Sequence, residues 1–134
     1  MNANYAEREM RGLAPAPQNM TKVIYYTNES GENPVDDFLN SLEKSQQRKL
    51  IRIFVTIQTY GLTAVISHTK RLVGLPLWEI RILGRNNIRV LYASITEGNI
   101  LLLHGFVKKS QQTSRKEINT ALNRLNDYLV KDTV

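Results

Sequence analysis

Two arginines lie in segments where apolar and polar residues alternate, one on each side of a short turn-like sequence. A guanidinium group can bind a phosphate through two parallel hydrogen bonds, so these arginines are candidates for a phosphate site. Arg81 lies within Leu77–Ile82, and Arg89 lies within Ile88–Ser94. Apolar and polar residues alternate in both segments, as in strands that bury one face. We expect helices to cover the apolar face and leave both arginines on an open face. The pair is then a phosphate site, or the arginines are solvated or paired with Glu79.

Further basic residues flank these segments. A Lys70-Arg71 pair precedes the first strand, and a Lys108-Lys109 pair follows the next apolar segment, Ile100–Phe106. Consecutive strands joined by short turns would bring both pairs to the rim of the arginine face, where they would follow a polynucleotide backbone. Solvated surface charges are the alternative. The residues assigned to RNA backbone contact are Lys70, Arg71, Arg85 and Arg115.

His104 is the histidine best placed for proton transfer, because an unperturbed imidazole titrates near neutral pH. It lies late in an apolar strand, so a buried imidazole hydrogen-bonded within the sheet is the alternative. His68 lies in a polar loop far from it. Two distant histidines without nearby acids make a poor metal site. The sequence predicts neither a metal nor another cofactor.

The composition limits the function classes. The chain has 134 residues, a net charge of +6 and no cysteine. Disulfides, thiolate metal sites and cysteine nucleophiles are therefore excluded. From His68 to Tyr92 there are five basic residues and one acidic residue. This asymmetry favours a polyanionic partner. No segment has the apolar length of a membrane span or a signal peptide, so we expect a cytoplasmic protein with no membrane contact.

The positioning elements belong to one domain, residues 21–134, preceded by a Pro/Ala-containing tail over residues 1–20. The change from a helical to an alternating period predicts an α+β fold. A helical hairpin and a C-terminal helix would pack on one face of an antiparallel sheet of about four strands. Asn33-Pro34 and Ser45 are the expected starts of the hairpin helices, and residues 63–76 are expected to be irregular. The predicted order is strand 21–26, helices 34–42 and 45–60, strands 77–82, 88–94 and 100–106, and helix 114–129.

Three segments carry a family resemblance. Leu77-Trp-Glu-Ile-Arg, Ile88-Arg-Val-Leu-Tyr and Leu101-Leu-Leu-His-Gly-Phe-Val-Lys-Lys, followed by Glu117-Ile118 and Ala121, resemble the phage-derived HigB-like branch of RelE/ParE toxins. The resemblance covers roughly residues 23–128. It implies a RelE-like fold and ribosome-dependent cleavage of messenger RNA without a metal. In that reaction the ribose 2′-hydroxyl attacks the adjacent phosphate and leaves a cyclic phosphate.

The resemblance also implies residue roles. Arg89 aligns with the strand arginine of the family, Lys108 and Lys109 align with its basic pair, and Arg81 lies among its basic second-strand residues. Arg81 and Arg89 would bind the scissile phosphate, and the lysines would bind RNA and assist proton transfer. Some members carry a tyrosine after the basic pair, whereas residues 110–118 contain none. His104 or a lysine is the expected substitute.

The implied partners are a HigA-like helix-turn-helix antitoxin, the ribosome and messenger RNA, with operator DNA reached only through the antitoxin. Two other functions fit the same residues. A ParE-like inhibitor of DNA gyrase would share the fold without needing RNA-cutting residues. A non-enzymatic module would use the basic face only to bind nucleic acid or protein.

Overall fold

A computed structural model of the chain describes residues 21–82, 84 and 87–132. The predicted tail over residues 1–20 and the predicted RNA contact Arg85 lie outside the described residues. The elements are β1 (Val23–Tyr25), α2 (Pro34–Ser41), α3 (Lys44–Tyr60), the 3₁₀ segment η1 (Leu62–His68), β2 (Thr69–Arg71), β3 (Trp78–Ile82), β4 (Ile88–Ser94), the 3₁₀ segment η2 (Thr96–Gly98), β5 (Ile100–Val107) and α4 (Arg115–Asp132).

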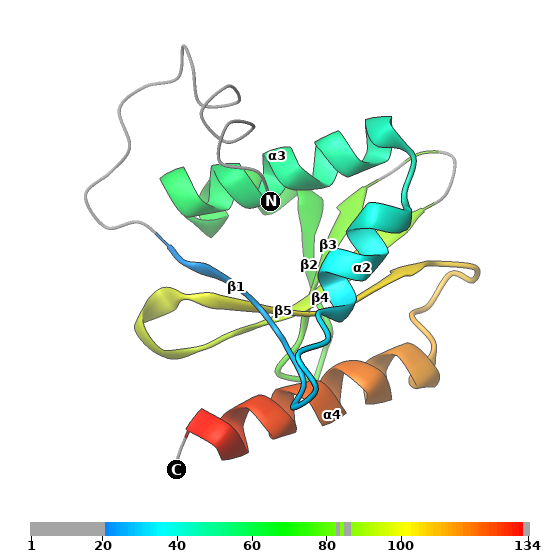
Figure 1. The fold of residues 1–134 in the computed structure, drawn as a ribbon. Coiled ribbons are helices and arrows are strands. Elements are labelled where there is room, and N and C mark those ends of the chain that lie inside the picture. Colours follow the sequence, from blue (N-terminus) through cyan, green and yellow to red (C-terminus); the bar gives the residue numbers. More distant parts are fainter. Residues whose placement is uncertain (1–20, 83, 85–86, 133–134) are drawn as a thin grey trace.

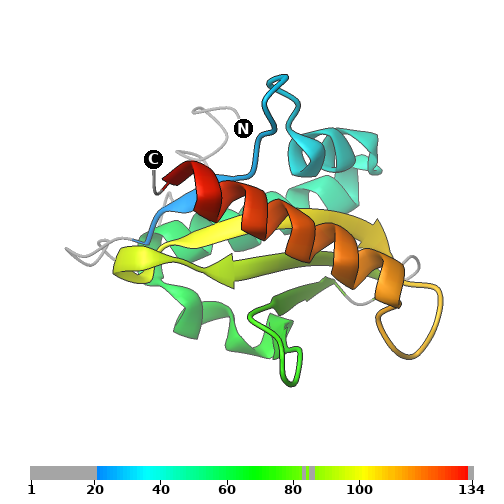
Figure 2. The same ribbon diagram turned by 90° about the horizontal axis from the view of Figure 1, so that it is seen from below.

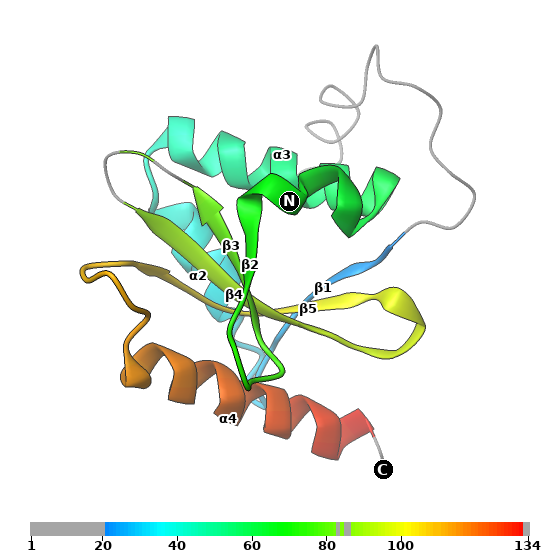
Figure 3. The same ribbon diagram turned by 180° about the vertical axis from the view of Figure 1, so that it is seen from behind.

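The strands form one sheet in the order β1-β5-β4-β3-β2, which confirms the α+β prediction (Figure 1). β1 runs parallel to β5, and the other neighbours are antiparallel. The fifth strand, β2, falls within the stretch predicted to be irregular and forms the edge beside β3 (Figure 3). Its three residues, Thr-Lys-Arg, carry no apolar alternation, so the sequence gives no strand signal there.

Helices cover both faces of the sheet, and the prediction of one open face was wrong. In Figure 1, α2 and α3 lie on one side of the sheet and α4 lies on the other. Figure 2 shows α4 running across β4 and β5. The cause is visible in β4, where Leu91 and Ala93 are buried beside α4 while Val90 and Tyr92 are buried on the α3 side. A strand that is apolar on both faces needs cover on both faces.

Local signals explain the helix ends. The Asn33 side chain accepts a hydrogen bond from the Asp36 backbone nitrogen (3.1 Å), which caps α2 as predicted. α3 ends at Gly61, whose φ of 84° favours glycine. Ser45 was the predicted cap of α3, but the helix begins one residue earlier and its N-cap is Glu43.

Gly105 sets the distance between α2 and β5. It faces the ring of Phe38, and a Cβ atom at this position would overlap that ring. The glycine therefore allows α2 to pack closely on the central strand. No helix within the described part of the chain combines the length and apolarity needed to cross a membrane.

Candidate functional site

Arg81 and Arg89 are direct cross-strand partners, so they lie on the same face of the sheet as predicted. That face is the one that α4 covers. Arg89 has only 5% of its surface exposed, whereas Arg81, nearer the sheet edge, is half-buried. The pair therefore consists of one deeply placed guanidinium and one nearer the surface.

Arg89 is fixed by an acidic partner from the neighbouring strand. Its Nε lies 3.0 Å from Oε1 of Glu79, an ion contact without hydrogen-bond alignment, and its Nη1 donates to the Ile88 carbonyl (3.0 Å). The other carboxylate oxygen of Glu79 accepts from the Thr113 hydroxyl (2.6 Å). Glu79 is 1% exposed. The alternative of an arginine paired with Glu79 is thus confirmed for Arg89.

A hollow of about 440 Å³ opens beside Arg89, and we call it the Arg89 hollow. The register of β4 and β5 explains its position, because Val107 pairs with Ile88 and the Lys108 nitrogen donates to the Asn87 carbonyl (2.9 Å). The predicted basic pair therefore stands at the start of β4. The residues that line the Arg89 hollow are Asn87, Arg89, Lys108, Lys109, Ser110 and Gln111.

A smaller hollow of about 230 Å³ shares Lys108, Lys109 and Ser110 with the first and reaches the start of α4. There it is lined by Ser114, Lys116 and Glu117, among others. The Glu117 nitrogen lies 3.5 Å from the Ser114 hydroxyl, which is in an N-capping position at the predicted start of the helix. Arg115, a predicted RNA contact, is exposed in the first turn of α4. Basic side chains thus continue from the Arg89 hollow to the helix start.

His104 does not line either hollow. Its Nε2 lies 3.1 Å from a Glu117 carboxylate oxygen, and its Nδ1 lies 3.2 Å from Nη1 of Arg124. Arg124 can only donate, so Nδ1 accepts and the proton of the neutral ring sits on Nε2. Burial lowers the pKa of His104, although Glu117 partly opposes this shift. The geometry favours a structural role that joins β5 to α4 over the proton-transfer role.

The basic pair on β2 divides between the two faces. Arg71 pairs with Trp78 on the α3 side, and its guanidinium carbon lies 6.0 Å from the Trp78 ring centre. Lys70 pairs with Glu79 and therefore lies on the α4 side. Both residues are exposed. Only Lys70 shares the arginine face, so the expectation of one common rim was wrong for Arg71.

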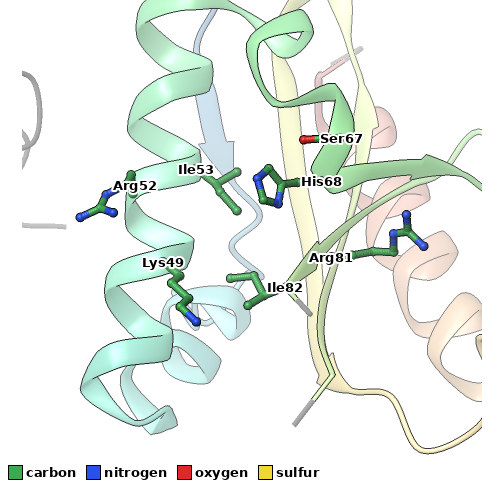
Figure 4. A pocket seen from close by; sticks show the side chains of 7 residues that line it. All are labelled: Lys49, Arg52, Ile53, Ser67, His68, Arg81 and Ile82. Carbon is green, nitrogen blue, oxygen red and sulfur yellow. The ribbon is translucent and has the colours of Figure 1, made fainter. Parts of the chain in front are cut away.

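A third hollow, the α3–β3 pocket, has a volume of about 420 Å³ and lies between α3, the end of η1 and the end of β3 (Figure 4). Sequence reasoning missed it, because its residues come from three segments with no shared motif. His68, which the sequence places in a polar loop, is exposed at this pocket. The lining residues are Lys49, Arg52, Ile53, Ser67, His68, Arg81 and Ile82.

Sequence reasoning also missed the supporting role of Thr113. Glu79 gave a signal, because it is the one acid among the five basic residues of the segment from His68 to Tyr92. Thr113 gave none, because its contact depends on how the loop after β5 folds back. Within the described ranges, no group of three or more His, Cys, Asp or Glu residues could hold a metal ion.

Comparison with known proteins identifies the family. Residues 37–126 match the model of the family described as phage derived protein Gp49-like (DUF891). This family belongs to the RelE/ParE-like toxin clan. None of the curated proteins compared with the chain matches it. The match runs from within α2 to within α4 and includes Arg89 and its hollow, so the chain belongs to the Gp49-like family of phage-derived, toxin-like proteins.

Proposed function

We propose that this protein is a toxin that cuts messenger RNA at the ribosome, in the cytoplasm, as a metal-independent endoribonuclease. The observation that carries the proposal is the Arg89 hollow. A guanidinium held by Glu79 forms one wall, and two lysines from the next loop form another. A fixed guanidinium beside two ammonium groups suits a phosphodiester whose negative charge increases during the reaction.

The charged residues in and beside the Arg89 hollow have different electrostatic roles. Glu79 offsets the charge of Arg89 and engages its Nε, while the Ile88 carbonyl engages Nη1. Nη2 is the nitrogen left to donate to a phosphate oxygen in the hollow. The net positive charge comes from Lys108 and Lys109, which belong to the same hollow.

The proposed reaction is an internal transesterification. The ribose 2′-oxygen forms a bond to phosphorus and loses its proton, while the bond from phosphorus to the 5′-oxygen breaks and that oxygen gains a proton. Because Glu79 is already engaged by Arg89 and Thr113, it does not serve as the base. We assign the proton transfers to Lys108 and Lys109, and keep His104 as the alternative to be tested.

The remaining basic residues extend the proposed RNA path. Arg81, beside Arg89, would bind the scissile phosphate or its neighbour. Lys70 on the same face, and Arg115 at the start of α4, would bind messenger or ribosomal backbone. We assign Arg71 and Arg85 the same role. Membership of a toxin-like family implies an antitoxin, and we propose one of the HigA-like helix-turn-helix kind.

The direct test compares wild type with Lys108→Ala/Lys109→Ala. The matched control is Lys44→Ala/Arg48→Ala, which removes two exposed cations from α3 and leaves the hollow intact. Mapped messenger ends in a translation extract should show cleavage by wild type and control. The Lys108→Ala/Lys109→Ala variant should cleave at least about 100-fold more slowly than wild type, as expected when transition-state donors are lost.

The same experiment separates the other functions. Equal cleavage by all three proteins would refute the assignment of the hollow. Intact RNA together with double-strand DNA breaks in the presence of gyrase would instead support a ParE-like inhibitor. Unchanged growth on expression without an antitoxin would support a non-enzymatic binding module.

A further inference from the structure

The smaller hollow beside the Arg89 hollow lies where the loop after β5 turns back into α4 (Figure 2), and it has a volume of about 230 Å³. Lys108, Lys109 and Ser110 line both hollows. A group in the smaller hollow would therefore be the neighbour of a phosphate held beside Arg89. We propose that the smaller hollow, which we call the Glu117 hollow, binds a guanine base next to the scissile phosphate. This inference rests on the proposed RNA substrate.

Glu117 is the chemical difference between the two hollows, because the described residues that line the Arg89 hollow include no acid. The Glu117 side chain is 21% exposed. Its Oε1 lies 3.1 Å from Nε2 of His104, whereas its Oε2 has no hydrogen-bond or ion-pair partner among the described residues. A carboxylate repels phosphate, so the Glu117 hollow is a poor second phosphate site although lysines line it. It fits an uncharged group that offers N–H donors, because a carboxylate can only accept hydrogen bonds.

The hydrogen-bonding edge of guanine matches a carboxylate better than the edges of the other bases do. Guanine presents two adjacent donors, N1–H and the N2 amino group, which can bind the two oxygens of one carboxylate. Adenine and cytosine each present one amino group beside a ring nitrogen that only accepts. Uracil presents one N–H between two carbonyl oxygens, which a carboxylate repels. The Glu117 Oε1 can still accept from guanine, because an oxygen that accepts one hydrogen bond from His104 retains a second lone pair.

The other residues that line the Glu117 hollow suit the rest of a base. Guanine carries the acceptor O6 next to N1–H, and Gln112 and Lys116 both have groups that can donate to it. Phe106 is 7% exposed and supplies an apolar wall. The volume of about 230 Å³ is below the range of about 300–1,000 Å³ that is typical of pockets for drug-sized ligands, so the hollow suits a single ring system.

The probes are four fluorescein-labelled RNA trinucleotides, UGU, UAU, UCU and UUU, that carry 2′-O-methyl riboses. Because they lack the 2′-hydroxyl, the proposed reaction cannot cut them, and binding is measured by itself. Fluorescence anisotropy gives the Kd of each trinucleotide for the full chain. UGU should bind about tenfold more tightly than UUU, as expected for one bidentate contact to a base, and UAU and UCU should also bind more weakly than UGU.

Glu117→Gln tests the carboxylate itself. The amide keeps one oxygen for His104 and replaces the other by an N–H donor, which opposes the second donor of guanine. The preference for UGU over UUU should fall to about twofold or less. The matched control is Glu43→Gln, the same change at an exposed residue before α3, and it should keep the tenfold preference. The ratio of the two Kd values separates recognition from folding, since a structural defect weakens both trinucleotides alike.

Several results would overturn the proposal. These are no binding of any trinucleotide, a wild-type preference for another base, or the same preference for UGU in Glu117→Gln as in wild type. Tighter binding of guanosine 5′-monophosphate than of UGU would assign the hollow to a free nucleotide. Messenger cleavage without a guanine preference would refute the Glu117 assignment and leave the proposed function supported. A guanine preference without messenger cleavage would support the base site and refute the proposed function.

Discussion

Replacing Glu79 by alanine removes the carboxylate that holds the Arg89 guanidinium. Glu79 is 1% exposed and Arg89 is 5% exposed. The substitution therefore leaves the Arg89 cation with little contact to water and with no anionic partner. Breaking a buried pair in this way costs about 3–5 kcal/mol. Arg89 lines a hollow that admits water, so we expect the lower end, about 3 kcal/mol. Thr113 also loses its acceptor, which adds to the loss.

The assay is urea unfolding at neutral pH, followed by circular dichroism. Two variants accompany Glu79→Ala. Glu79→Gln keeps the shape and an acceptor oxygen, so we expect a smaller loss of about 1.5 kcal/mol. Glu79→Leu/Arg89→Met replaces both charges by apolar groups and should recover most of the stability, because it removes the desolvation cost of both. The double variant should nevertheless lack RNA cleavage.

A loss below about 1 kcal/mol for Glu79→Ala would contradict the reasoning, because it would place Arg89 in a well-solvated position. A double variant no more stable than Glu79→Ala would show that the ion pair itself is needed for folding. Retained cleavage in the double variant would refute the role of Arg89 without touching the stability argument.

Three further outcomes follow from contacts elsewhere in the molecule. Gly105→Ala should lower the free energy of unfolding by about 2–3 kcal/mol, because its Cβ would overlap the Phe38 ring, and combination with Phe38→Ala should restore part of the loss in urea unfolding. Burial lowers the pKa of His104, so the unfolded chain takes up this proton first as the pH falls below 6.5. Stability should therefore decline with falling pH in that range, and His104→Gln should flatten the decline in pH-dependent melting. Tyr26→Phe should raise the pKa of Asp127 toward its ordinary value in an NMR titration, because the 2.6 Å hydrogen bond from Tyr26 is the main cause that lowers it.

The parts of the fold that depend on local pattern were predictable. Alternation in β3 and β4 placed Arg81 and Arg89 side by side, and Asn33-Pro34 and Gly61 marked helix ends. These features need only the period of a strand or the preference of a cap. The α+β class followed from the same local signals, whereas its RelE-like arrangement was implied only by the family resemblance.

The parts that depend on contacts between distant segments were not predictable. The position of α4 requires knowing that Leu91 and Leu101 need cover on the second face. β2 has three residues and is specified by its partner β3. Thr113 reaches Glu79 across 34 positions of sequence. No spacing in the chain encodes such a contact, so the state of Arg89 could be seen only in three dimensions.

The parallel pairing of β1 with β5 also bears on how the protein is made. β1 is the first described strand to leave the ribosome, yet its partner residues, Ile100–Leu102, are translated only after β3 and β4. Pairing between such distant segments is slow to form, because a long loop must close first. The lysines of the Arg89 hollow and Thr113 are translated later still. A growing chain therefore carries no finished Arg89 hollow until residues 108–113 have been translated, and the ribosome that synthesises it is not exposed to the completed site before that point.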